Sequence, residues 1–484
     1  MNPNILLGAV LFVLAGGTLA FGAVYPWAFT PLAVAAALVG IVGIVTGRTG
    51  RPPLAWLAGS LAVIAGAMSL QLVPMPASLL ARVSPGTDQF LRQQDLGYLT
   101  AVTPDPRGET PATEPRRPIS VSPGNTLVGI GLYAALVVFL VGCTRIISRT
   151  SARPVADGLL WLGVGLAVLG IVQDLTIGRD KDMLVYGFWK PLQGGSPFGP
   201  FINRNHFGGW MLMVLPIALA RTVDRLLQAA DRMGRRMHDL LSLTRGEEGG
   251  AIVMSAAGAV VMGLSLVLTR SRSAVGAMAI GAVVFGIVLV RQETGRRGRV
   301  LMTLALAAIL GLVLTGAGVN TAFGRFTAVD TSSTAVTSVN TLAGRVGIWR
   351  DTLAMAGRSP LTGLGLNSYG TATIVYQSGV RTLHWAEAHN DYLQIAAEGG
   401  LLVGLPSLIA LGIIVWQVRA RFREAPRSGT TYWTRVGAVV GLVSIAAQSA
   451  FEFSLQMPAN ALLFALLLAI ALHRSPNVRT THVD

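Results

Sequence analysis

The chain has 484 residues, of which 52% are hydrophobic and only 13% are charged, and its formal net charge is +15. Soluble proteins carry about 25% charged residues, so a soluble multidomain protein is excluded, and the apolar content excludes a disordered chain. A single cysteine, Cys143, excludes a disulfide-stapled fold. The basic residues lie between long apolar runs, so no nucleic-acid partner is predicted. The composition predicts an all-α polytopic membrane protein.

Apolar runs that are long enough to cross a bilayer recur along the whole chain. A spanning helix needs about 20 mostly apolar residues, and on this criterion we predict about 12 transmembrane helices. The first run lacks a small-residue cleavage site, so we expect a span there rather than a cleaved signal peptide. The predicted spans are 4–23, 27–46, 54–74, 124–143, 155–174, 207–222, 250–269, 274–291, 300–318, 399–418, 435–453 and 457–473.

The basic residues between these spans predict the orientation of the chain. Arginines gather in alternate connections, for example 145–153, 221–245 and 419–435, as the positive-inside rule requires of cytoplasmic segments. We therefore predict that both termini are cytoplasmic and that the lipid bilayer surrounds the helices. The +15 charge is mostly a signal of topology.

The connections on the opposite side of the membrane include three long ones, about 75–123, 175–206 and 319–398. The first is polar with mixed charge and predicts a solvated loop. The last is longer than a plain connection requires, so we expect short helices in it. The predicted divisions are 1–318 for helices 1–9 with their outer loops, 319–398 for the large periplasmic loop, and 399–484 for helices 10–12 with a cytoplasmic tail.

Two arginines lie in the short turn 269–273, on the side where the orientation predicts few. Arg270 and Arg272 have no neighbouring acid in the sequence. An arginine at the membrane edge can extend its side chain to the headgroups, which is the alternative interpretation. Two of them in five residues favour an anion-binding site, because the guanidinium fork suits phosphate oxygens.

A stretch rich in glycine and proline, 195–209, precedes the sixth predicted span. Irregular backbone at membrane depth is tolerated only inside protein or along a cavity. Asn203 or Asn205 is a candidate N-cap of the following helix, but a cap leaves Arg204 on the outer side unexplained. His206 is either a neighbour of that cap or a ligand-binding residue.

The end of the large outer loop, 384–400, contains the best candidate for a general base. If a helix begins near Asn390, His389 lies at its N-terminal end, where the helix dipole opposes protonation, and a neutral imidazole is what a base needs. A metal site formed by His384, Glu387 and His389 is an alternative, but the spacing is not a recognised zinc pattern. A purely structural histidine is the third interpretation.

A fourth segment, 344–353, has an apolar stripe at helical spacing that includes Trp349. Arg345 and Arg350 flank the stripe, and because Asp351 can neutralise one of them, only Arg345 is a candidate ligand. Acidic residues stand at span ends rather than mid-span, and no internal repeat is evident, which counts against an ion-coupled transporter. Transport of a lipid-linked or anionic solute remains the alternative from another functional class.

Several short motifs follow one another in a fixed order on the predicted outer side. They are Asn203-Arg204-Asn205-His206-Phe207, Ser271-Arg272-Ser273-Ala274, Arg345 with Trp349, Pro360 with Gly363 and Gly365, and His389-Asn390. With the multi-span topology, this set resembles the superfamily of O-antigen ligases and O-antigen polymerases, which are glycosyltransferases of the bacterial inner membrane.

The resemblance implies transfer of a glycan from undecaprenyl diphosphate to a hydroxyl of a glycan or lipid acceptor on the periplasmic face, without metal or cofactor. It implies that Arg204 and Arg272 hold the diphosphate and that His389 is the catalytic base, and we predict Arg270, in the same turn as Arg272, as a further diphosphate-binding residue. The remaining candidate substrate-binding residues are Arg345, His206 and Asn390.

This sequence differs from the lipopolysaccharide ligase pattern at Val403, where that pattern has glycine. The departure favours a polymerase of O-antigen or exopolysaccharide as the alternative activity within cell-surface polysaccharide biosynthesis.

Overall fold

The computed structural model describes residues 3–46, 53–103, 114–177, 184–191, 195–233, 246–291, 342–378, 384–424 and 428–474. Regular structure in these ranges is helical, apart from isolated bridges and one antiparallel pair of two-residue strands, in which β1 (Met75–Pro76) pairs with β2 (Arg116–Arg117). The predicted all-α class is therefore confirmed.

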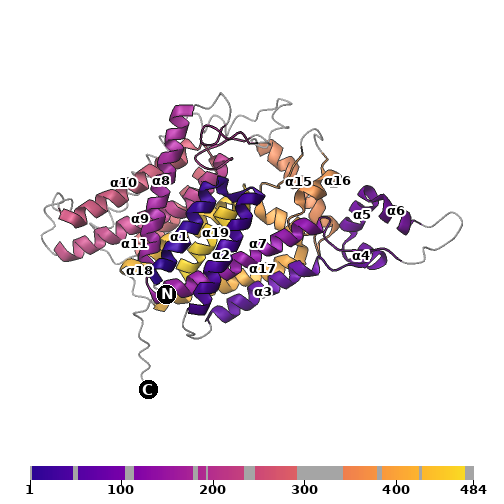
Figure 1. The fold of residues 1–484 in the computed structure, drawn as a ribbon, viewed down its shortest axis with the longest axis horizontal. Coiled ribbons are helices and arrows are strands. Elements are labelled where there is room, and N and C mark those ends of the chain that lie inside the picture. Colours follow the sequence, from indigo (N-terminus) through magenta and orange to yellow (C-terminus); the bar gives the residue numbers. More distant parts are fainter. Residues whose placement is uncertain are drawn as a thin grey trace, which may run out of the picture.

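Long, mostly apolar helices pack side by side and form the body of the molecule (Figure 1). Each predicted span coincides with one of them, except 300–318, which lies outside the described residues. These helices are α1 (Pro3–Leu19), α2 (Pro26–Thr46), α3 (Pro53–Leu70), α7 (Pro123–Arg149), α8 (Arg153–Ile177), α9 (Arg204–Met233), α10 (Gly246–Leu268), α11 (Arg272–Arg291), α17 (Asp391–Glu424), α18 (Thr430–Gln448) and α19 (Pro458–Leu472).

Six helices of the described ranges are long and apolar enough to cross a membrane, namely α2, α7, α8, α10, α11 and α17. Large apolar side chains such as Phe12, Val45 and Trp56 are exposed on the surface of the body. Water would not solvate such a surface, whereas lipid does. The chain is therefore a multi-pass membrane protein, and about 12 spans stays a prediction.

Close helix approach in the body depends on small residues. α2 and α7 meet at Gly40 and Gly142, where a Cβ atom added to Gly142 would lie 2.2 Å from the carbonyl oxygen of Gly40. Without a side chain at either position, the two backbones come into contact, which is the usual way in which helices associate tightly in lipid. α9 and α19 form the interior, since nearly every residue of 207–218 and 459–472 is buried.

Among the described residues, arginines predicted to be cytoplasmic lie at one end of the body and form an arginine cluster that includes Arg145, Arg421, Arg435 and Arg474. Arg145 of α7 donates to the carbonyl oxygen of Ile44 at the end of α2, 2.8 Å away. Buried Arg435 at the start of α18 donates to carbonyl oxygens at the ends of α17 and α19, including those of Arg421 and His473. These contacts, with a bond from Arg474 to Ser148, bring the ends of α2, α7, α17 and α19 and the start of α18 to the same end of the body, and the side of the membrane stays a prediction.

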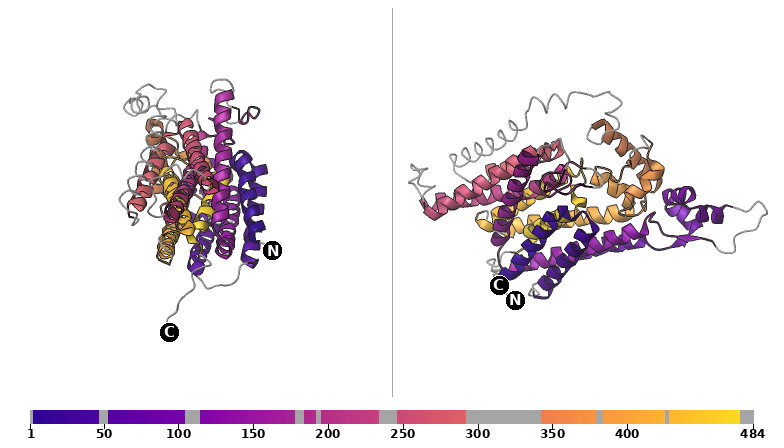
Figure 2. Two further views of the ribbon diagram at one scale, coloured as in Figure 1. Left: turned by 90° about the vertical axis from the view of Figure 1, so that its left-hand side faces the viewer. Right: turned by 45° about the horizontal axis from the view of Figure 1, so that its top comes forward.

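A lobe of short helices lies to one side of the body, at the end opposite the arginine cluster (Figures 1 and 2). Gly86 donates its backbone N–H to Ser359 Oγ, 3.0 Å away, so two parts of the lobe that are distant in sequence are joined. The lobe comprises β1, β2, α4 (Ala77–Val83), α5 (Pro85–Gln94), α6 (Leu96–Val102), α15 (Leu342–Arg358) and α16 (Tyr369–Tyr376).

The structure of the lobe contradicts the solvated loop predicted for 75–123 and agrees with the short helices predicted in 319–398. Segment 75–123 is not a plain solvated loop, because its short helices bury Leu80, Tyr98 and Ile119 against one another. The polar composition hid this small apolar core. The short helices expected in 319–398 are present in its described part, as α15 and α16, while 319–341 lies outside the described residues.

Helix α17 begins at Asp391, earlier than the predicted 399, and is broken at Gly400, whose φ is 53° and ψ is −155°. The chain at 359–366 docks on this break. Leu364 donates its backbone N–H to Ala397, and Leu401 donates to Pro360, at 3.1 and 2.9 Å. These bonds satisfy the backbone groups that the break frees.

Gly363 is the tightest point of this contact, and its replacement by alanine is expected to destabilise the lobe. Its φ is +64°, and an added Cβ would lie 2.2 Å from the carbonyl carbon and oxygen of Glu398. Strain in the left-handed region alone costs about 1–3 kcal/mol, and the clash adds to it. We expect Gly363→Ala to lower the thermal unfolding midpoint of the purified protein. The matched control is Gly404→Ala, because nothing lies within 4 Å of the added Cβ there. Equal midpoints for the two variants would contradict the interpretation.

Candidate active site

The site is built around the start of α9, at the end of the body opposite the arginine cluster. The Oδ1 atom of Asn203 accepts the backbone N–H of Asn205 at 2.9 Å, which confirms Asn203 as the N-cap. The preceding glycine- and proline-rich segment folds back, so that the backbone N–H of Arg204 donates to Ser196 at 2.7 Å. Half-buried Arg204 is thereby fixed as the first residue of α9.

The start of α11 lies directly against the start of α9. A Cβ added to Gly208 would lie 2.7 Å from the Cβ of Ala274, so the two first turns are in contact. Arg272 is the first residue of α11, as Arg204 is of α9. Two helix N-termini, each with an arginine at the first position, therefore lie side by side. Helix N-termini carry a partial positive charge, so the combination favours an anionic ligand.

Arg270 has a different local role from Arg272. It lies between α10 and α11 with a φ of 53°, and its backbone N–H donates to Val267 at 2.9 Å. A left-handed residue of this kind ends a helix by satisfying a free carbonyl group. The side chain of Arg270 is exposed in the same turn as that of Arg272.

Glu452 lies at the centre of the site and was missed by the sequence analysis as a functional residue. It is buried in the connection between α18 and α19. Its carboxylate accepts hydrogen bonds from Arg345 and from Asn205 Nδ2, the latter at 2.7 Å. His389 Nδ1 lies 3.3 Å from Glu452 Oε2. The glutamate thus joins the start of α9, helix α15 and the start of α17.

The partners of Glu452 keep it ionised. Burial raises the pKa of the Glu452 carboxyl, but the hydrogen bond from His389 and the positive charge of Arg345 outweigh burial, and the pKa lies below its ordinary value. Arg345 also donates to the backbone carbonyl oxygen of Phe451 at 2.7 Å, which fixes the guanidinium beside the carboxylate. The candidate ligand Arg345 is therefore engaged within the protein.

The ring of Phe453 separates the two histidines predicted for the site. The ring centroids of His206 and His389 lie 4.7 and 4.8 Å from that of Phe453, both edge to face. His206 is buried, and its Nε2 has no hydrogen-bond partner among the described residues. His389 is the more accessible of the two, since 14% of its side chain is exposed.

The backbone around His389 is held by several contacts. Trp349 Nε1 donates to the carbonyl oxygen of Ala388 at 3.1 Å, and Gln394 Oε1 accepts the N–H of Ala388 at 3.0 Å. Asn390 Oδ1 accepts the backbone N–H groups of the next turn, so Asn390 caps α17, and His389 lies directly before the helix start. His389 itself has a φ of 50°, a strained conformation that persists only where neighbours enforce it.

Asp351 and Glu387, for which the sequence suggested an arginine partner and a metal ion, form hydrogen bonds with other residues. The carboxylate of Asp351 accepts hydrogen bonds from the backbone N–H and the hydroxyl group of Ser378, while Arg345 forms an ion pair with Glu452. Glu387 accepts from Gln394, and burial raises its pKa to about 8. In the ranges that the structure describes, no group of three or more His, Cys, Asp or Glu side chains is placed to hold a metal ion.

A comparison with known families identifies the central part of the chain. Residues 257–408, about a third of the sequence, match the family model described as O-antigen ligase. The matched segment contains Arg272, Arg345 and His389, whereas Arg204 and Glu452 lie outside it. No curated protein matches the chain significantly. The resemblance found in the sequence is confirmed: residues 257–408 of this multi-pass membrane protein are similar to the O-antigen ligase family.

Proposed function

We propose that the protein is a glycosyltransferase of the bacterial inner membrane that moves a glycan from undecaprenyl diphosphate to an acceptor hydroxyl on the periplasmic face. The observation that carries the proposal is the placement of His389, bound to the buried carboxylate of Glu452, near two adjoining helix starts that bear Arg204 and Arg272. The basic residues at the opposite end support a cytoplasmic location for that end and for both termini.

The arginine side of the site suits the donor. As the bond between the sugar and the diphosphate breaks, negative charge grows on the leaving phosphate oxygen. Arg204 and Arg272, at the positive ends of their helices, would stabilise this charge without reorganising. Arg270, exposed in the same turn, would contact the outer part of the diphosphate.

The His389–Glu452 pair suits the acceptor. With Nδ1–H donating to Glu452, Nε2 of the neutral imidazole is the nitrogen left to take a proton. The acceptor oxygen would attack the anomeric carbon while its proton passes to Nε2. The bond from that carbon to the diphosphate oxygen breaks, and its electron pair leaves with the diphosphate. A single displacement of this kind inverts the anomeric carbon. Glu452 holds the tautomer and stabilises the imidazolium, as carboxylates do in other His-based sites.

Arg345 acts in this scheme as a positioning residue. Its guanidinium binds Glu452 and the Phe451 carbonyl group, so it keeps the carboxylate ionised and fixed. This role differs from direct substrate binding, which the sequence suggested.

Loss of the two helix-start arginines tests the donor part of the proposal. We expect Arg204→Ala and Arg272→Ala each to reduce transfer from an undecaprenyl-diphosphate-linked glycan by about 10²-fold or more, since one preorganised donor of this kind contributes about that much. Membrane insertion should be unchanged. The measurement is transfer by purified protein in lipid nanodiscs, together with the surface glycans of a complemented deletion strain.

The control for these variants is Arg350→Ala, which removes an exposed arginine of α15. It should transfer at the wild-type rate. Wild-type transfer by both Arg204→Ala and Arg272→Ala would refute the diphosphate role. In the deletion strain, loss of all attached polymer identifies a ligase, whereas attachment of single repeat units identifies a polymerase.

A further inference from the structure

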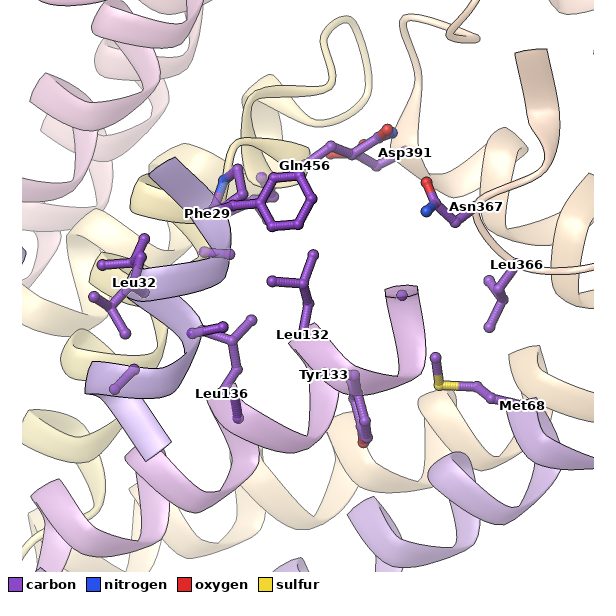
Figure 3. A pocket seen from close by; sticks show the side chains of 18 of the residues that line it. Phe29, Leu32, Met68, Leu132, Tyr133, Leu136, Leu366, Asn367, Asp391 and Gln456 are labelled. Atoms are coloured by element: carbon purple, nitrogen blue, oxygen red, sulfur yellow. The ribbon is translucent and has the colours of Figure 1, made fainter. Parts of the chain in front are cut away.

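A cavity of about 390 Å³ lies beside the active site, between α2, α3, α7, α17 and α19. Most of its wall is apolar, and Figure 3 shows Leu132 and Leu136 of α7 facing Leu32 of α2, with Met68 of α3 at the other side. Its volume is within the range of cavities that bind small ligands. An apolar wall of this kind suits a hydrocarbon chain.

Polar side chains line one end of the cavity, and none of them is basic. Asn367, Asp391 and Gln456 lie at this end (Figure 3), and Gln394 and Glu398 also line the cavity. Asp391 Oδ1 accepts from Gln456 Nε2 at 2.9 Å. No lysine, arginine or histidine is among the lining residues.

The chemistry of this end favours hydroxyl groups over phosphate. Carboxylate and amide oxygens accept hydrogen bonds from hydroxyls, and amide N–H groups donate to them. A phosphate would meet only acids and neutral groups, and like charges this close repel each other. An uncharged sugar head therefore fits this end of the cavity.

The polar end adjoins the base. Asp391 follows His389 by two residues, and its backbone N–H donates to Ser449 at 2.9 Å, in the same connection that carries Glu452. Gln394 joins the two regions, because its Oε1 accepts the N–H of Ala388, next to His389. His389 thus lies between the arginine-bearing helix starts and this cation-free cavity.

We propose that the cavity is the acceptor subsite, and that it binds the apolar chain of an uncharged, hydroxyl-bearing glycolipid with its sugar next to Asp391. The assignment rests on the proposed function, since it supplies the acceptor for the transfer. It separates the two substrates by charge: the anionic donor binds on the arginine side of His389, and the neutral acceptor binds on the acid and amide side.

The test is photolabelling of the full chain in nanodiscs of phosphatidylethanolamine and phosphatidylglycerol. Two probes are compared at equal concentration, a diazirine-bearing dodecyl glucoside and a diazirine-bearing dodecyl phosphate, and adducts are mapped by mass spectrometry. We expect the glucoside to label residues of α2 and α7 that line the cavity at least fivefold more than the phosphate does. Leu132→Trp, which fills the cavity, should remove this labelling, and so should Met68→Trp, which fills it from α3.

The matched control is Ala134→Trp, on the outer face of α7 and two residues from Leu132. It should leave glucoside labelling unchanged. Equal labelling of the cavity by both probes, labelling by neither, or full labelling in both cavity-filling variants would overturn the assignment and leave a phospholipid site or an empty cavity. The readout is binding, so it is independent of catalysis. If labelling is as expected but the variants Arg204→Ala and Arg272→Ala keep wild-type transfer, the proposed function fails and the glycolipid site stands.

Discussion

Replacement of His389 by alanine is expected to lower the rate of glycan transfer by about 10²–10⁴-fold, the usual contribution of a general base. The acceptor hydroxyl is a poor nucleophile while it keeps its proton, and in the structure Nε2 of His389 is the nitrogen left to take it. Donor binding should change little, because the arginines at the starts of α9 and α11 are intact. The measurement is kcat and KM for both substrates from pH 5 to pH 9.

His384→Ala is the matched control for this variant, because His384 is exposed in the same loop and has no contact with Glu452 among the described residues. It should keep the wild-type rate and pH profile. Wild-type turnover of His389→Ala across this pH range would remove His389 as the base, whatever the control shows.

Replacement of Glu452 by glutamine should reduce both stability and transfer. The variant leaves the half-buried guanidinium of Arg345 without the carboxylate of Glu452, and because that guanidinium is partly exposed the cost is less than the about 3–5 kcal/mol of a fully buried ion pair. It also removes the carboxylate that fixes the tautomer of His389, so we expect kcat to fall by about 10²-fold or more. The double variant Glu452→Gln/Arg345→Gln should recover stability but not the rate. Recovery of both would show that Glu452 acts only through folding.

The stability effect of Glu452 has a defined pH dependence. Its pKa in the folded protein lies below the ordinary value of 4.5, so its ionised form stabilises the fold. This contribution is fully present above 4.5 and is lost as the pH falls through the lowered pKa. Unfolding midpoints of wild type and Glu452→Gln should therefore differ near neutral pH and converge in acid. Glu424→Gln, which breaks an ion pair with Arg421 at the opposite end of the body, should leave transfer unchanged.

The sequence predicted the body of the fold well, because span length and apolar content are local properties. The placement of the motifs with Arg204, Arg272 and His389 at one common end of the body was also accessible, since charge bias and helix starts are local properties too. The way in which these motifs come together in the folded protein could not be predicted from the sequence. It depends on the packing of α9 against α11 at Gly208 and on the connection that carries Glu452.

Glu452 escaped the sequence analysis for a physical reason. It stands between two phenylalanines at the end of an apolar run, where an acid is usually an ordinary polar residue at the membrane edge. Its partners Arg345 and Asn205 are 107 and 247 residues away in sequence, so only tertiary packing brings them together. The one local signal was an acid flanked by aromatic residues in an otherwise apolar segment.

The carboxylate of Glu452 holds together groups from α9, α15 and α17, and this has a consequence for biosynthesis. Ribosomes deliver membrane helices in chain order, so Arg345, His389 and both helix-start arginines enter the membrane before Glu452 is made. Until the connection between α18 and α19 has been translated, His389 has no carboxylate to orient it. A chain that ends before this connection would therefore contain the arginines and the histidine of the site but lack the carboxylate on which the proposed transfer depends.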